Sequence, residues 1–150
     1  MTLVFAMDEF VATWVSQRVK HYRPNPGQYV AIGIAEGQRL IAGAVYHDFT
    51  GPGIGMTLAA DSPRWATKGN IAALLRYPFV QLNCRRVSVC AAKSNKRSRK
   101  LIEGVGFKLE GVIREGFGKE DAILYGMLRR ECKWLERKEH GQVQQRASGA

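Results

Sequence analysis

Alternation of apolar and polar residues divides most of this 150-residue chain into strand-like runs. β-rich segments occur at 3–5, 29–36, 39–49, 54–60, 86–91, 107–115 and 122–129. Gly37-Gln38 separates two of them, and a Gly-X pair in that place is typical of a tight hairpin turn. The pattern predicts a sheet of six to seven strands.

Three other segments have the spacing of amphipathic helices. The first starts at Asp8, which is placed to cap it, and runs to about Val19. Roughly on one side it carries Phe10, Val11, Trp14, Val15 and Arg18. The second follows Asp61-Ser62-Pro63, has Ile71, Leu74 and Leu75 inward, and should end or kink at Pro78. A strand–helix–strand order implies at least one parallel crossover. We therefore expect an α/β fold with a twisted mixed sheet flanked by helices.

The third helical segment, 95–105, has an unusual inward face. Steps of three and four residues place on one side Asn95, Ser98, Leu101, Ile102 and Val105. Cations occupy the opposite side, at Lys96, Arg97, Arg99 and Lys100. Polar side chains on a packed face are costly unless they are paired or bind something. Asn95 and Ser98 are therefore candidate binding residues, although Asn95 could also simply cap the helix.

Composition indicates a folded domain with an anionic partner. Apolar residues make up 45% of the chain, and the net charge is +10 with a pI near 9.9. This charge favours a nucleotide cofactor, nucleic acid, a ribonucleoprotein or an acidic protein. We expect one domain over residues 1–137 and a polar, flexible tail over 138–150.

Several other classes of protein are not supported by the sequence. No apolar run approaches the roughly 20 residues of a membrane span, and the first residues turn acidic at once, unlike a signal peptide. Three cysteines without a C-x-x-C pair support neither disulfides nor a zinc site, and the histidines have no metal-ligand spacing. We expect a cytoplasmic protein with no metal, whose histidines, His47 among them, are loop or surface residues.

One motif resembles a known family. The pattern Asn-x-x-Ser-x-x-Leu-x-x-x-x-Gly-Phe occurs at Asn95, Ser98, Leu101, Gly106 and Phe107, followed by Glu110-Gly111 and Arg114. It resembles the signature of the Gcn5-related N-acetyltransferase (GNAT) superfamily, closest to the branch of ribosomal-protein N-terminal acetyltransferases. The similarity covers about residues 54–130. The chain also resembles short acetyltransferases carried by bacteriophages, through Trp65-Ala66-Thr67 and 76–79.

The resemblance implies acetyl-coenzyme A as co-substrate. The family pattern Gln/Arg-x-x-Gly-x-Gly/Ala is met in part at 64–69, with Thr67 where the first glycine is usual. A helix start after a strand suits a pyrophosphate, because its free amides and dipole attract anions. The implied binding residues are Leu58, Ala59, Arg64, Trp65, Ala66, Thr67, Lys68, Gly69, Asn95, Ser98 and Arg99. Trp65 has an alternative interpretation as a packing residue.

The mechanism implied is direct acetyl transfer to an amine. A backbone N–H from 56–60 would polarise the thioester carbonyl between two splayed strands. Ser98 stands where the ribosomal branch has a serine, while Ile102 replaces the tyrosine acid of many members. Candidate catalytic residues are Ser98, Glu115 and Tyr125; Tyr125 has a core-aromatic alternative, and Glu36, Glu120 and Asp121 qualify as bases by residue type only. The branch's glutamate position falls on Phe117.

Two alternatives stay open at the level of sequence. The basic clusters could make this chain a nucleic-acid or ribonucleoprotein module. The departures at Thr67 and Ile102 would also fit an inactive fold that binds coenzyme A without turnover. The amine acceptor (a protein N-terminus, a lysine or a small amine) is not indicated, and the resemblance raises a homodimer as a further option.

Overall fold

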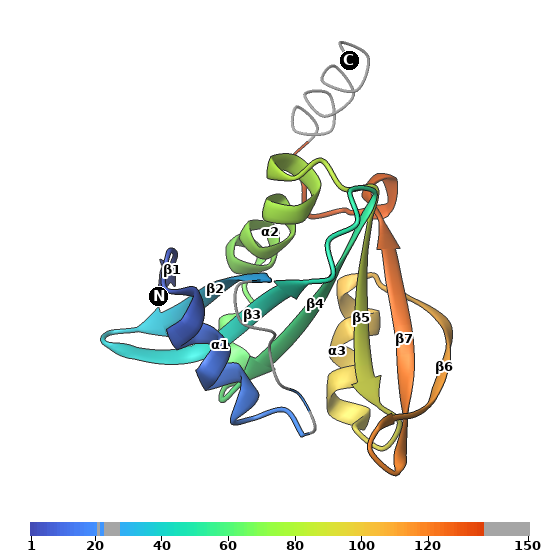
Figure 1. The fold of residues 1–150 in the computed structure, drawn as a ribbon. Coiled ribbons are helices and arrows are strands. Elements are labelled where there is room, and N and C mark those ends of the chain that lie inside the picture. The colour runs from blue at the N-terminus through green and yellow to red at the C-terminus, as the bar shows by residue number, and fades with distance from the viewer. Residues whose placement is uncertain (21, 23–27, 137–150) are drawn as a thin grey trace.

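A computed structural model describes residues 1–20, 22 and 28–136. Strands and helices alternate irregularly along this part of the chain (Figure 1). Their bounds are β1 Thr2–Val4, α1 Asp8–Ser16, β2 Tyr29–Glu36, β3 Arg39–His47, β4 Gly53–Ala60, α2 Lys68–Arg76, β5 Arg86–Ala92, α3 Lys96–Val105, β6 Lys108–Phe117 and β7 Glu120–Leu128. Short helical turns lie at Pro63–Trp65, Tyr77–Gln81 and Arg129–Glu131.

The seven strands of the described residues form one mixed sheet in the order β1-β2-β3-β4-β5-β7-β6. β4 and β5 are parallel, and every other neighbouring pair is antiparallel. A parallel pair needs a crossover, and the segment containing α2 supplies it. This arrangement confirms the predicted fold class and strand number.

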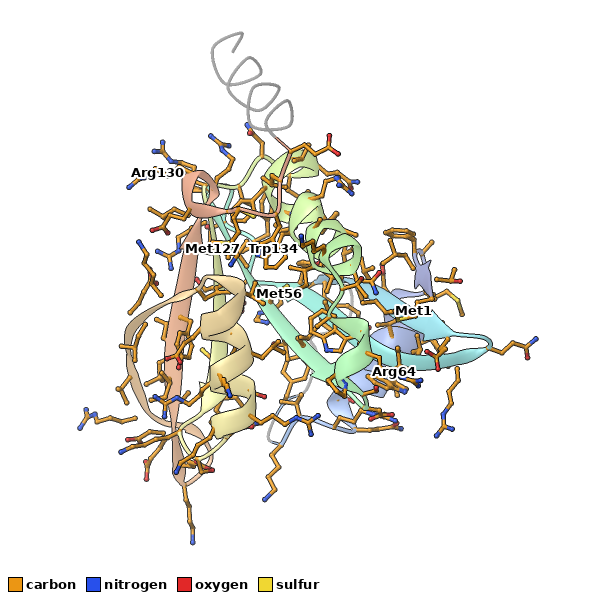
Figure 2. All side chains as sticks on the ribbon, turned by 180° about the vertical axis from the view of Figure 1, so that it is seen from behind. Met1, Met56, Arg64, Met127, Arg130 and Trp134 are labelled. Carbon is orange, nitrogen blue, oxygen red and sulfur yellow. The ribbon has the colours of Figure 1, made fainter. Side chains whose placement is uncertain are left out.

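Helices cover both faces of the sheet. On one face, α1 inserts Val11, Ala12 and Val15 into a cluster with Val45 and Ala59. On the other face, seen from behind in Figure 2, α2 and α3 lie over the larger cluster, to which α2 contributes Ile71, Leu74 and Leu75. β4 is shared between the two clusters, because its successive side chains point to opposite faces.

The first helix differs from the prediction at both ends. Met7, not Asp8, is the N-cap residue, and the Asp8 carboxylate instead accepts a hydrogen bond of 3.0 Å from the Ala31 amide of β2. The helix ends at Ser16 rather than near Val19, and of the residues on its apolar side Val11 and Val15 are buried while Phe10 is 57% exposed. Asp8 therefore attaches the helix to the sheet, a long-range role that helix-cap rules do not consider.

The inward face predicted for the third helix is correct only in its second half. Leu101, Ile102 and Val105 pack against the larger cluster, but no residue of α3 is fully buried. Asn95 is exposed, and its Oδ1 caps the helix by accepting a 3.1 Å hydrogen bond from the Ser98 amide. The cost expected for a buried, unpaired asparagine therefore does not arise.

Two predicted segments cannot be compared with the structure. The predicted polar tail over 138–150 lies outside the described residues, as does most of the loop 21–27. No helix within the described ranges is long and apolar enough to cross a membrane.

A buried tyrosine compensates for the proline that follows α2. The regular helical partner of the Leu74 carbonyl would be the amide of residue 78, but Pro78 has none. Tyr46 of β3, only 1% exposed, donates its hydroxyl to that carbonyl at 2.5 Å, and its ring meets Tyr77 edge-on. Pro78 and Tyr46 together therefore join α2 to the centre of the sheet.

We expect Tyr46→Phe to lower the free energy of unfolding by about 2 kcal/mol, because it removes the donor to a buried carbonyl. Urea denaturation would measure the loss. In a Pro78→Ala background, which restores an amide at residue 78, the same substitution should cost clearly less. Equal losses in both backgrounds would contradict this pairing of roles.

Candidate functional site

The parallel strands β4 and β5 separate halfway along their length. Their pairing runs from Gly53 opposite Arg86 to Met56 opposite Val89 and then stops. Beyond that point β4 continues to Ala60 beside β3, while β5 continues to Ala92 beside β7. Figure 1 shows the two strands diverging toward their carboxyl ends. The sheet therefore contains a wedge-shaped gap, into which backbone groups of both strands can point.

The register of β3 and β4 identifies the backbone groups that face this gap. The Asp61 amide donates to the Ile41 carbonyl at 2.8 Å, so odd-numbered residues of β4 bond to β3. Leu58 and Ala60 consequently direct their backbone groups toward the gap. Of the residues 56–60 expected to supply an oxyanion-type donor, Leu58 and Ala60 are therefore the candidates beyond the paired part of β4. The backbone of Ala59 faces β3 instead, and its side chain packs against α1.

The loop after β4 ends in the N-terminus of α2. Thr67 caps the helix by accepting a hydrogen bond from the Asn70 amide at 3.2 Å. Among the described residues, no acceptor faces the amides of Lys68 and Gly69. A Cβ at Gly69 would meet nothing within 4 Å, so the space outside this turn is open. Two free amides, a helix dipole and the Lys68 ammonium can together attract a phosphate.

The other predicted loop residues have mainly structural contacts. Trp65 is 4% exposed and belongs to the core, so its ring supports the loop from below. The Ala66 amide donates to the Pro63 carbonyl at 3.1 Å. Arg64 is exposed and forms an ion pair of 2.8 Å with Glu36 at the end of β2. Glu36, one of the base candidates, is therefore a partner of the loop arginine.

The start of α3 lies at the other side of the gap. Ser98 is half-buried, and its hydroxyl makes no hydrogen bond to any described residue. Asn95 holds the helix start through its cap. Ser98 is thus the polar side chain of the predicted pair that is available to a ligand.

Tyr125 and Arg99 connect α3 to the sheet. Arg99 donates from Nε to the Tyr125 hydroxyl at 3.1 Å and from Nη1 to the Lys93 carbonyl at 3.1 Å. The tyrosine hydroxyl in turn donates to Glu103 at 3.2 Å, and its ring is completely buried. The hydrogen bond to Tyr125, and to a smaller extent the charge of Glu103, raises the pKa of Arg99 above its ordinary value. The geometry matches the core-aromatic interpretation of Tyr125, because its hydroxyl has two protein partners.

Glu115 lies apart from these groups, near the tip of the β6–β7 hairpin. Its amide donates to Asp121 at 2.9 Å, and with Arg114 and Asp121 it lines an open hollow of about 580 Å³. Glu120, on the same hairpin, accepts from Ser94, which lowers the pKa of its carboxyl. β6 is the edge strand of the sheet, and β7 and β5 lie between it and the gap, so the structure does not bring Glu115 together with the other predicted site residues.

A cluster that the sequence did not indicate lies where the gap begins. His47, expected to be a simple surface or loop residue, bonds Asp48 through Nδ1 at 2.7 Å and Thr57 through Nε2 at 2.8 Å. Asp48 is next to His47 in the sequence, but Thr57 meets His47 only through the register of β3 against β4, which periodicity does not fix. Within the described part of the chain, no three His, Cys, Asp or Glu residues are grouped to hold a metal ion.

The known proteins that this chain resembles are named as acetyltransferases. No family model matches the chain. The Bacillus subtilis (strain 168) protein named "Putative ribosomal N-acetyltransferase YdaF" is 39% identical over 72 residues, which cover 43% of this chain and 39% of that protein. The match therefore spans well under half the length of this curated relative.

Solved structures match over more of the chain. A probable acetyltransferase has 27% identity and a TM-score of 0.58, covering 69% of this chain and 63% of the other. A point mutant of the spermidine N-acetyltransferase SpeG from Vibrio cholerae has 16% identity and a TM-score of 0.69, covering 92% and 99%. Ribosomal-protein-S5-alanine acetyltransferase from Vibrio fischeri has 16% identity and a TM-score of 0.59, covering 73% and 65%. At such low identities the last two establish the fold alone.

Proposed function

We propose that this chain, which has the fold of the GNAT acetyltransferases, is an N-acetyltransferase that moves an acetyl group from acetyl-coenzyme A to a primary amine. The observation that carries the proposal is the gap between β4 and β5, with a helix N-terminus following each strand. A gap in a sheet exposes backbone donors that a paired strand would use up, so it offers a binding place for an extended acyl carrier.

The residues present fit acetyl-coenzyme A. The free amides of Lys68 and Gly69 would hold its pyrophosphate, with the Lys68 side chain adding charge. The open space at Gly69 would allow phosphates to approach the backbone there. The threonine in place of the family's first glycine would cap the helix through its side chain, as it accepts from the Asn70 amide. When bound, acetyl-coenzyme A would supply an activated acyl thioester.

The chain's own groups would assist the transfer at the gap. A backbone N–H of Leu58 or Ala60 would stabilise negative charge on the carbonyl oxygen, an effect worth about 3 kcal/mol for one donor. Ser98 would orient the sulfur or a water beside it. Tyr125 would act indirectly by keeping Arg99 and Glu103, and so the start of α3, in place.

The proposed acceptor is a primary amine, without a choice between a protein N-terminus, a lysine and a small amine. The similar proteins include ones named as a putative ribosomal N-acetyltransferase, a ribosomal-protein-S5-alanine acetyltransferase and a spermidine N-acetyltransferase. The net charge of +10 favours an amine carried by an acidic protein or a ribonucleoprotein.

The test is release of free thiol from acetyl-coenzyme A, with an alanine-terminated peptide, a lysine-containing peptide blocked at its N-terminus, and spermidine as acceptors. We expect release that depends on at least one acceptor, together with binding of coenzyme A measured by calorimetry. Cofactor binding without release for any of these amines would favour an inactive fold. No cofactor binding, with salt-sensitive binding of an oligonucleotide instead, would favour the nucleic-acid module.

A further inference from the structure

Three polar residues form a continuous hydrogen-bonded chain at the vertex of the gap. His47 ends β3, Asp48 follows it, and Thr57 lies in β4. Asp48 Oδ2 is 2.7 Å from His47 Nδ1, and Thr57 Oγ1 is 2.8 Å from His47 Nε2. A carboxylate only accepts, so it fixes the ring proton on Nδ1 and leaves Nε2 to accept from the threonine hydroxyl. In a carboxylate, an imidazole and a hydroxyl in this order, the imidazole can take the hydroxyl proton while the carboxylate stabilises the imidazolium that forms.

The backbone around the histidine is arranged to hold its ring. The ring lies over Gly55, where a Cβ would come within 2.7 Å of its Cε1 and 2.9 Å of its Nδ1. Asp48 has a φ of +56°, a left-handed conformation that aspartate tolerates better than most residues. The glycine at residue 55 leaves room for the imidazole ring, and the left-handed backbone of Asp48 lets its carboxylate reach His47. A histidine that only pointed into solvent would need neither feature.

The chain of groups lies at the place where β4 leaves β5. Met56 is the last residue of β4 paired with β5, so Thr57 is the first beyond the pairing. The side chains of Met56 and Leu58 lie on the face of α2 and α3, whereas Thr57 shares the opposite face with Ala59 and α1. If the coenzyme binds on the face covered by α2 and α3, Thr57 would lie on the opposite face of the sheet, next to the thioester in the gap.

A phenol completes the surroundings of Thr57. Tyr22 follows α1, and its hydroxyl is buried without a hydrogen-bond partner among the described residues. It lies beside Thr57, and its ring is 6.1 Å from that of His47. The ionisable groups facing the histidine are Asp48, Tyr22 and the adjacent Tyr29 of β2. Burial is the main reason that the pKa of each tyrosine is raised, so both stay neutral near neutral pH.

We propose that Thr57 and His47, with Asp48 as positioning residue, form the proton relay that deprotonates the acceptor amine on the α1 face of the gap. This inference rests on the proposed acetyl transfer. The amine nitrogen bonds to the acyl carbon as the carbon–sulfur bond breaks. The nitrogen proton goes to Thr57 Oγ1, whose own proton goes to His47 Nε2, and the coenzyme thiolate takes up a proton from solvent to leave as the thiol. The imidazolium that results is stabilised by Asp48 and returns its proton to solvent.

The test compares Thr57→Val with Thr57→Ser and His47→Gln with wild type. Rates with the best acceptor of the panel are followed as a function of pH, and coenzyme A binding and melting temperature are recorded for each variant. We expect Thr57→Val and His47→Gln to lower kcat about 100-fold, with coenzyme binding unchanged. Thr57→Ser should keep most of the rate because it keeps the hydroxyl. The rise of rate with pH in the wild type should disappear in His47→Gln.

The outcomes separate this inference from the proposed function. If the wild type turns over and His47→Gln keeps both its rate and its pH profile, the relay is overturned and acetyl transfer stands. If Thr57→Ser falls as low as Thr57→Val at unchanged melting temperature, the hydroxyl is not the active feature, and the relay is again overturned. If the wild type binds no coenzyme A and releases no thiol, the proposed function fails and the relay with it.

Discussion

Gly69→Asp is expected to lower the affinity for acetyl-coenzyme A at least 100-fold without destabilising the fold. Gly69 lies in the first turn of α2, where a new side chain meets nothing within 4 Å. An acidic residue in this turn interacts favourably with the helix dipole, by about 0.5 kcal/mol. The same charge would repel a pyrophosphate: two like charges 4 Å apart near a surface repel by about 4 kcal/mol. Calorimetry and thermal melting would measure both effects.

Two variants serve as controls for this experiment. Gly69→Ala adds a methyl group without charge, and we expect it to bind nearly as tightly as wild type. Gly104→Asp adds the same charge at another open helical glycine, on α3, and should leave binding unchanged. Binding by Gly69→Asp within threefold of wild type would show that the phosphates do not lie at α2.

The order of elements was predictable because it depends on local patterns. The Gly37-Gln38 turn, with Gly37 at a φ of +64°, joins two strands as the sequence predicts. Val87 and Val89 of β5 are buried, as their alternation predicts. Boundaries that depend on tertiary contacts were less predictable: the third run ends at His47 rather than Phe49, because Asp48 turns the chain.

The positions of candidate site residues were predictable where they depend on the order of helices and strands, and not where they depend on the register between strands. Thr67 and Asn95 both begin helices after strands, so their positions follow from the order of elements. The sequence could not decide between capping and ligand binding for Asn95, and its contacts show capping. His47 and Thr57 are ten residues apart on two strands, and a shift of one residue would place them on opposite faces.

The close packing of α1 on the sheet leads to a second large expected effect, which is a loss of stability. Gly33 and Gly43 are paired across β2 and β3 beneath this helix. A Cβ at Gly43 would lie 2.9 Å from Val15 Cγ2 and 3.0 Å from Val11 Cγ1, both fully buried. The helix is therefore close to the sheet because neither glycine has a side chain, a contact that periodicity does not reveal.

We expect Gly43→Val to lower the free energy of unfolding by about 3 kcal/mol, because the new side chain overpacks this contact and pushes α1 away. Urea denaturation would measure the loss. Gly111→Val is the matched control in β6, where a Cβ meets nothing within 4 Å, and it should be neutral or slightly stabilising. In Gly43→Ala, removing the facing methyls by Val15→Ala should cost less than in wild type, since the vacated space accommodates the new Cβ. Strictly additive losses in that pair, or an unchanged stability of Gly43→Val, would contradict close packing of α1 as the reason for the glycine.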